Sequence, residues 1–190
     1  MVDLSPIRSE RLSLVAMSPE LLAIMCGQAA SDRPFDWPTW WPDATDRSHL
    51  TMWRARATEA AANIVWGPRA IVDANREMVG HGGFHLPPQS LERALGDPSF
   101  VGKRDPAAGG VVEVGYTIFP AHRHHGYATE AVEALISWAE TTGEVAAVLA
   151  SIAEDNAPSA RVLERVGGFV MIGRCRNDDQ VVEAVFRRDL

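Results

Sequence analysis

One uninterrupted run of the chain combines a strand pattern, a glycine turn and an amphipathic helix. The segment V-V-E-V-G-Y-T-I-F (111–119) is rich in β-branched and aromatic residues and predicts a strand. Four apolar residues after Gly126 lie three or four positions apart, as on one face of a helix: Val132, Leu135, Ile136 and Ala139. This helix is expected to end at about Thr142, and V-A-A-V-L-A-S-I (145–152) then predicts a buried strand. Strands that alternate with helices favour an α/β fold.

The other segments extend this pattern over the whole chain. A helix is expected from Ser18, the N-cap before Pro19, and two more over the ranges 46–63 and 157–168. Further strands are expected at 11–17, 69–73, 78–85, 169–175 and 180–187. A long connection rich in Pro and Gly occupies residues 86–110. We therefore predict a single domain over residues 1–190 with a mixed central sheet.

Composition and charge argue against several classes of function. The net charge of −7 disfavours nucleic acid as the main partner, because phosphate binding needs clustered positive charge. No apolar run approaches the roughly 20 residues that cross a membrane, and the start of the chain lacks the apolar core of a signal peptide. Cys26 and Cys175 are spaced for neither a zinc cluster nor a disulfide framework. A cytoplasmic protein is expected.

The stretch H-R-H-H-G-Y-A-T-E-A (122–131) admits three interpretations: a metal site, a catalytic histidine cluster or an anion-binding turn. Its histidines, with His81 and His85 on one face of a strand, could form a metal site, but no cysteine partner is spaced for it. Alternatively, the turn places several backbone amides at the start of a helix, where the helix dipole favours an anion. Arg123 adds positive charge, and Gly126 lets an anion approach without a Cβ in the way. We favour the anion turn and expect no metal.

On its own the spacing R-x-x-G-x-A is a weak motif, but its surroundings make it specific. It follows G-Y-T-I-F-P (115–120) and precedes N-A-P-S-A-R-V-L-E-R-V-G-G-F (156–169), while E-R-L-S-L (10–14) lies near the start. With these segments, nearly the whole chain resembles the GNAT superfamily of acetyl-CoA-dependent N-acetyltransferases, nearest to the branch of ribosomal-protein N-terminal acetyltransferases. The resemblance implies a mixed central sheet with helices on both faces. Relatives often lack residues 86–110, which would then be an insertion.

The resemblance also implies where acetyl-CoA, the cosubstrate, binds. Backbone amides of six consecutive residues would hold the pyrophosphate of coenzyme A (CoA): His124, His125, Gly126, Tyr127, Ala128 and Thr129. Arg123 would add its charge beside them. The backbone of Thr117, Ile118 and Phe119 would pair with the pantetheine arm like an added strand. Asn156 would contact the same arm, although an asparagine there could equally cap a helix.

Acetyl transfer to an amine requires a base, a stabilised oxyanion and a proton for the departing thiolate. The resemblance implies Glu113 as the general base, and its apolar strand fits because burial raises the pKa of a carboxyl. Glu113 could instead lie on a solvated face or pair with an arginine. A backbone amide near Ile118 would hold the oxyanion. Many relatives carry a tyrosine where this chain has Leu163, so Ser159 is the candidate acid, although a serine near a helix start often caps amides.

The aromatic segment between the first two helices is the candidate acceptor site, because relatives build the acceptor pocket in this region. Trp37, Trp40 and Trp41 could hold an alkylammonium by cation–π contacts, or could fill the edge of the core. Asp36 and Asp43 could attract a cationic acceptor or be solvated.

Together these features predict an acyltransferase that moves acetyl from acetyl-CoA to a primary amine by direct attack in a ternary complex. The acceptor would be a small molecule or a protein N-terminus. The alternative is a CoA-binding regulatory module without catalysis; the absent tyrosine leaves room for it and Glu113 argues against it. A nucleotide-binding domain of another class would need a different spacing. A homodimer is compatible with any of these readings.

Overall fold

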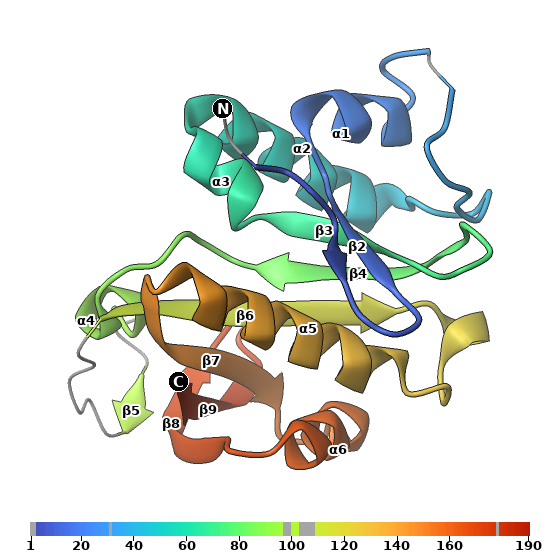
Figure 1. Cartoon of the computed structure of the whole chain (residues 1–190). Helices are drawn as coiled ribbons and strands as arrows, with labels where there is room; N and C mark the ends of the chain where they lie inside the picture. The colour runs from blue at the N-terminus through green and yellow to red at the C-terminus, as the bar shows by residue number, and fades with distance from the viewer. Residues whose placement is uncertain (1–2, 31, 97–99, 103–108, 178) are drawn as a thin grey trace. The chain divides into compact units, whose positions relative to one another are not determined.

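The computed structural model describes residues 3–30, 32–96, 100–102, 109–177 and 179–190 (Figure 1). The chain groups into two compact units: the first comprises residues 1–87 and 116–131, and the second comprises residues 88–115 and 132–190. Both contain strands and helices, so the predicted α/β class is confirmed. Among the described residues, no helix combines the length and the apolar character that crossing a membrane would need.

The first unit is built on four antiparallel strands in the order of the chain: β1 (Ile7–Arg8), β2 (Ser13–Ala16), β3 (Pro68–Val72) and β4 (Met78–Phe84). The last residues of β6 (Gly110–Ile118) also belong to this unit, and the amide of Phe119 donates to the carbonyl of Val79 at 2.9 Å. The backbones approach closely here. A Cβ on Gly80 would lie 2.2 Å from the carbonyl oxygen of Thr117, so glycine is required at this point of β4.

Three helices accompany these strands in Figure 1: α1 (Pro19–Met25), α2 (Ala44–Glu59) and α3 (Ala61–Val65). The predicted cap of α1 is present, because the side chain of Ser18 accepts a hydrogen bond from the amide of Leu21 at 3.3 Å. The helix predicted over 46–63 is two helices. Ala60 is extended (φ −153°, ψ 140°) and separates them. Asp43 forms a capping box with Asp46 at the start of α2, which gives Asp43 a structural role.

A charged residue, Arg69 of β3, is buried in the core of the first unit and is 2% exposed. Its guanidinium donates to the carbonyls of Val65 at 2.8 Å and Leu14 at 3.4 Å. Burial lowers the pKa of Arg69 to about 10, because removing the cation from water disfavours its charged form. Arg69 therefore joins the end of α3 to strands β2 and β3.

The second unit has the strand order β6-β7-β9-β8-β5. The bounds of the further strands are β7 (Val145–Ala153), β9 (Val182–Asp189), β8 (Val170–Arg176) and β5 (Val101–Gly102). Strands β6 and β7 are parallel, with Glu113 opposite Leu149, and the other pairs are antiparallel. The predicted mixed sheet is therefore present. Helix α5 (Tyr127–Thr142) starts in the first unit and continues into the second, which also contains α6 (Ala157–Val166).

The proposed insertion at 86–110 contains more regular structure than its Pro/Gly-rich sequence suggests. It includes the short helix α4 (Leu91–Ala94), whose N-cap Ser90 accepts from the amide of Arg93, and the strand β5. Three apolar side chains of this segment are buried in the core of the second unit: Leu91, Leu95 and Phe100. Residues 97–99 and 103–108 lie outside the described residues. The described part of the segment thus contributes to the core.

Candidate functional site

The first element of the candidate site is the turn between β6 and α5. A short 3-10 helix (Pro120–His122) follows the strand, and α5 begins at Tyr127. The amide of Glu130 donates to the carbonyl of Gly126 at 3.1 Å. The amides of Tyr127, Ala128 and Thr129 precede this bond, and a helix leaves such amides without an intrahelical acceptor. With the positive end of the helix dipole, they form a site suited to an anion.

Two residues of this turn have left-handed backbone conformations. His124 has φ 66° and Gly126 has φ 82°. A side chain at Gly126 would be strained by this φ, and its Cβ would lie 3.4 Å from Nη2 of Arg11. The sequence therefore places glycine where the turn needs it. His124 adopts the same region without glycine's freedom, so the surrounding contacts must stabilise that conformation.

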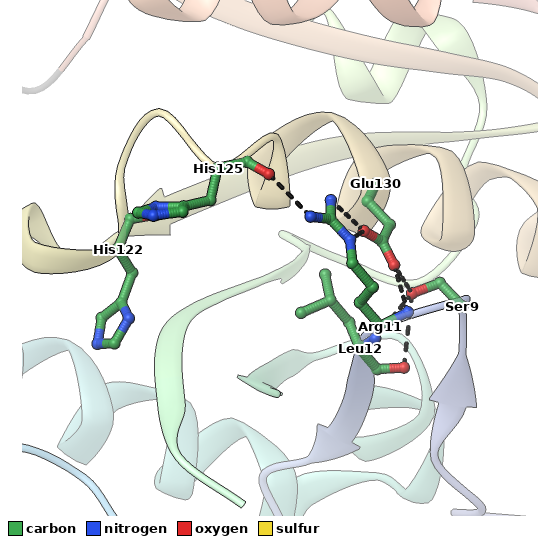
Figure 2. Close-up of polar contacts among 6 residues, drawn as sticks. All are labelled: Ser9, Arg11, Leu12, His122, His125 and Glu130. Carbon is green, nitrogen blue, oxygen red and sulfur yellow. Dashed lines mark hydrogen bonds and ion pairs between the residues drawn. The ribbon is translucent and has the colours of Figure 1, made fainter. Parts of the chain in front are cut away.

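Arg11, from the connection between β1 and β2, contacts this turn (Figure 2). Its Nε lies 2.7 Å and its Nη2 lies 2.6 Å from Oε2 of Glu130, and its Nη1 donates to the carbonyl of His125 at 3.0 Å. The other carboxylate oxygen, Oε1, accepts from the Ser9 hydroxyl and the Arg11 amide, each at 2.7 Å. Burial alone would raise the pKa of Glu130, but these hydrogen bonds and the charge of Arg11 lower it below its ordinary value.

The basic side chains within the turn lie as follows. The Nε of Arg123 donates to the carbonyl of Ile118 at 3.0 Å, so this exposed side chain is directed back toward the strand end. The His125 ring stacks on Tyr127 with centroids 5.8 Å apart. Nε2 of His122 lies 3.8 Å from Oε1 of Glu77. Across the described residues, no group of three or more His, Cys, Asp and Glu side chains is arranged to hold a metal ion.

The strand end proposed to pair with the pantetheine arm already has some of its backbone groups engaged. The amide of Phe119 donates to Val79, and the carbonyl of Ile118 accepts from Arg123. Thr117 is exposed, whereas Ile118 and Phe119 are buried. A pantetheine arm would therefore have to use other backbone groups of this segment, or displace Arg123 from Ile118.

The three candidate tryptophans have different environments. Trp37 is 6% exposed, and the guanidinium of Arg33 covers its ring at 4.2 Å. Trp41 is 3% exposed and packs on Phe119 with centroids 5.6 Å apart. Trp40 is 56% exposed and meets Phe119 edge to face at 5.1 Å. Core packing therefore accounts for Trp37 and Trp41, while much of the Trp40 side chain remains exposed beside Phe119.

His81 of β4 joins the same aromatic cluster. Its ring centroid lies 5.9 Å from Trp41 and 6.3 Å from Phe119. Burial lowers the pKa of His81, Asp46 partly opposes that shift, and His49 adds to it. A histidine in this state is neutral at pH 7. His85, predicted to share a strand face with His81, lies one residue beyond the end of β4 (Met78–Phe84).

Three further candidates belong to the second unit. Glu113 of β6 is half-buried, between the buried residues Val112 and Val114. Oδ1 of Asn156 accepts from the amide of Ser159 at 3.2 Å and thereby caps α6. The capping role anticipated for Asn156 is therefore present, and Ser159 is the donor rather than the cap.

Comparison with known proteins decides the family. The family model described as an acetyltransferase (GNAT) domain matches residues 11–168. The chain belongs to the GNAT acetyltransferase family. GNAT enzymes use acetyl-CoA as their cosubstrate, so the resemblance noted in the sequence is confirmed at the level of the family.

Individual relatives agree with this assignment. The chain is 30% identical over 99 residues to a Bacillus subtilis (strain 168) protein named uncharacterized N-acetyltransferase YjdG; the match covers 52% of this chain and 58% of the relative. A putative GNAT-family acetyltransferase from Bordetella pertussis has a TM-score of 0.61 at 23% identity, covering 95% of this chain and 97% of the other. A putative ribosomal-protein-serine acetyltransferase from Vibrio cholerae has a TM-score of 0.64 at 16% identity, with both chains fully covered at 100%. At such identities the solved structures support the GNAT fold alone.

The GNAT assignment leaves two features that the motif did not indicate. Arg11 lies in the E-R-L-S-L segment that supported the resemblance, yet nothing in the sequence connects it with Glu130, 119 positions away. The sequence indicates His81 only as a metal candidate. Its partners, Trp41 and Phe119, come from other parts of the chain.

Proposed function

We propose that this GNAT protein transfers acetyl from acetyl-CoA to a primary amine by direct attack in a ternary complex. The observation that carries the proposal is the turn before α5. Its amides at Tyr127, Ala128 and Thr129 precede the first helical hydrogen bond. A pyrophosphate is the anion that CoA brings to such a site. Gly126, with φ 82°, supplies the left-handed backbone that the turn needs directly before these amides.

The aromatic cluster supports the choice of acceptor site. Phe119 ends the segment proposed to pair with the pantetheine arm, and Trp40 packs directly on it. A primary ammonium over the exposed face of Trp40 would gain a cation–π contact beside the segment proposed to pair with that arm. Trp41 would support Trp40 and Phe119 from the core. We assign acceptor contact to Trp40, because Arg33 already covers Trp37.

The chemistry needs three functions from the chain. In the proposed reaction the amine nitrogen bonds to the acetyl carbon, the carbon–sulfur bond breaks, and the amine loses a proton while the thiolate gains one. Glu113 is proposed as the base that accepts the amine proton, directly or through water. A backbone amide near Ile118 is proposed to stabilise the oxyanion, and Ser159 to deliver the proton to sulfur. Asn156 is proposed to contact the pantetheine arm.

A non-catalytic CoA-binding module is the competing function, and two measurements separate them. Calorimetric titration with CoA tests the cosubstrate, and a lack of binding at millimolar concentration would remove the proposal. Thiol release from acetyl-CoA is then followed over a panel of amines that includes peptide N-termini, polyamines and aminoglycosides. CoA binding without turnover on any amine would support the regulatory module. Transfer to peptide N-termini would support a protein acceptor over a small molecule.

The base is tested within the same assay. Glu113→Gln is expected to lower kcat on the order of 10²–10⁴-fold at neutral pH while CoA affinity is kept, because a positioned base contributes about that much. Glu164→Gln, an exposed glutamate on α6, is the matched control and should leave kcat unchanged. Full activity of Glu113→Gln would show that another group accepts the proton.

A further inference from the structure

The contacts of Arg11 and Glu130 go beyond what an exposed ion pair usually provides. Three nitrogens of the guanidinium and both oxygens of the carboxylate have partners, and Ser9 adds its hydroxyl (Figure 2). The guanidinium also lies 5.0 Å from the centre of the Tyr127 ring. Three successive positions are therefore near this side chain or bonded to it: the carbonyl of His125, the site of the absent Cβ of Gly126 and the Tyr127 ring. Glu130, one helical turn further on, is the fourth.

We propose that Arg11 and Glu130 are positioning residues for CoA, which fix the turn in the conformation that presents its amides to the pyrophosphate. The proposal rests on the proposed function, because it concerns the same turn. It assigns to the β1–β2 connection, distant in sequence from the anion site, a part in binding the cosubstrate.

The arrangement points to positioning rather than to direct phosphate contact. Nε and Nη2 of Arg11 are directed at Glu130, and Nη1 at the carbonyl of His125. The Glu130 carboxylate, bonded in this way, offsets the positive charge of Arg11 that would otherwise attract a phosphate. Arg123 and the backbone amides remain the groups suited to the anion itself.

The conformation that needs support is the left-handed one. An L-residue such as His124 at φ 66° is strained relative to a right-handed conformation, because its Cβ approaches the neighbouring carbonyl oxygen. The bond from Arg11 to His125 acts on the next peptide unit, and the ion pair ties that bond to the first turn of α5. Without them the turn would have to be ordered at the moment of binding, which weakens affinity.

The variants that test this proposal are Arg11→Met and Glu130→Gln. Each is expected to raise the KM for acetyl-CoA and the Kd for CoA about tenfold or more, since a hydrogen bond to a charged group is lost. The value of kcat at saturating acetyl-CoA should stay within about twofold, because the reacting groups are untouched. Arg8→Met is the matched control: it removes the same charge from the neighbouring strand β1, where Arg8 bonds to Ser13, and should leave both constants unchanged.

A second donor separates the turn from the rest of the site. S-acetyl-N-acetylcysteamine has the thioester but no pyrophosphate, so its kcat/KM should be the same in Arg11→Met and in the parent. Arg11→Lys keeps one ion pair with Glu130 but cannot bond to Glu130 and to the His125 carbonyl through separate nitrogens of a planar guanidinium. An intermediate KM for acetyl-CoA is therefore expected. Circular dichroism and thermal unfolding show that each variant is folded.

The outcomes are distinct. Parent protein that neither binds CoA nor uses acetyl-CoA would remove the proposed function itself. An active parent whose Arg11→Met and Glu130→Gln variants keep the parental KM would overturn only the positioning proposal. An equal loss of kcat/KM with both donors would also overturn it, because the defect would then lie outside the pyrophosphate turn.

Discussion

Oδ1 of Asn156 accepts the backbone amide proton of Ser159 at 3.2 Å, which makes Asn156 the N-cap of α6. Helix N-caps stabilise a protein by satisfying an amide that has no intrahelical partner. The proposed contact of Asn156 with the pantetheine arm would be a second role of the same side chain. Since the cap uses only the side-chain oxygen, substitutions can separate the two roles.

The first prediction concerns this separation. Asn156→Ala should lower the free energy of unfolding by about 1 kcal/mol, whereas Asn156→Asp should keep the cap and the stability. Both variants lack the side-chain amide donor, so both should bind CoA more weakly if that donor contacts the arm. Urea unfolding and calorimetric titration measure the two effects. Parental CoA affinity in Asn156→Asp would leave Asn156 with the capping role alone.

The second prediction concerns the pH dependence of stability. Burial lowers the pKa of His81 in the folded state, while an unfolded histidine titrates near its ordinary value of about 6.5. Between the folded pKa and about 6.5 the unfolded chain binds more protons, so the free energy of unfolding falls as the pH decreases through this window. The contribution of His81 to stability is fully present above about pH 6.5.

Urea unfolding at pH 7.5 and pH 5.5 measures this loss. Replacing the histidine in His81→Phe should reduce the difference between the two pH values. The exposed residue His124, replaced in His124→Asn, is the comparison, because asparagine tolerates a left-handed φ. An unchanged pH difference in His81→Phe would assign the effect to other groups.

The third prediction distinguishes two neighbouring tryptophans. Trp41→Ala should destabilise the protein by about 3–5 kcal/mol, because it leaves a cavity against Phe119 and His81. Trp41→Phe should cost much less, since the indole Nε1 has no hydrogen-bond partner among the described residues. Trp40→Ala should change the free energy of unfolding only slightly, because the side chain is largely exposed.

Enzyme kinetics should distinguish the two tryptophans in the opposite way, with the larger effect at Trp40. Trp40→Ala should raise the KM for the amine acceptor with little change in the KM for acetyl-CoA. Steady-state rates with each substrate varied in turn distinguish the two effects. An acceptor KM equal to that of the parent would show that Trp40 does not bind the amine.

Much of the fold follows from local patterns, and the departures have physical causes. Ser18 caps α1 as expected, because its signal lies within four residues of sequence. The break at Ala60 has no such signal, since alanine favours a helix. There the side-chain amide of Asn63 donates to the carbonyl of Arg56 at 2.8 Å, a contact that exists only once the chain turns. The break is thus accompanied by a side-chain contact that helix propensity does not indicate.

In the candidate site, too, features set by neighbouring residues could be predicted from the sequence, whereas features set by distant contacts could not. Gly126 and the start of α5 could be read from the sequence, because a turn and a helix start are local. The difference between Trp40 and Trp41 could not, since adjacent residues in an irregular segment carry no periodicity that assigns a face. The burial of Leu91 and Phe100 in the core could not be predicted either, because the Pro/Gly-rich segment 86–110 has no periodicity that indicates a buried face.

The sequence separation of Arg11 and Glu130 bears on how the anion site comes into being. The two residues are 119 positions apart, so no local segment can assemble the turn together with its support. Closing so long a loop is entropically costly and is compensated only when most of the intervening chain is in place. A ligand that binds only the completed turn would therefore raise the apparent stability of the surrounding fold, by about 2.7 kcal/mol at a hundredfold excess over its Kd. The cellular concentration of such a ligand would then govern how long the protein persists, as well as how fast it works.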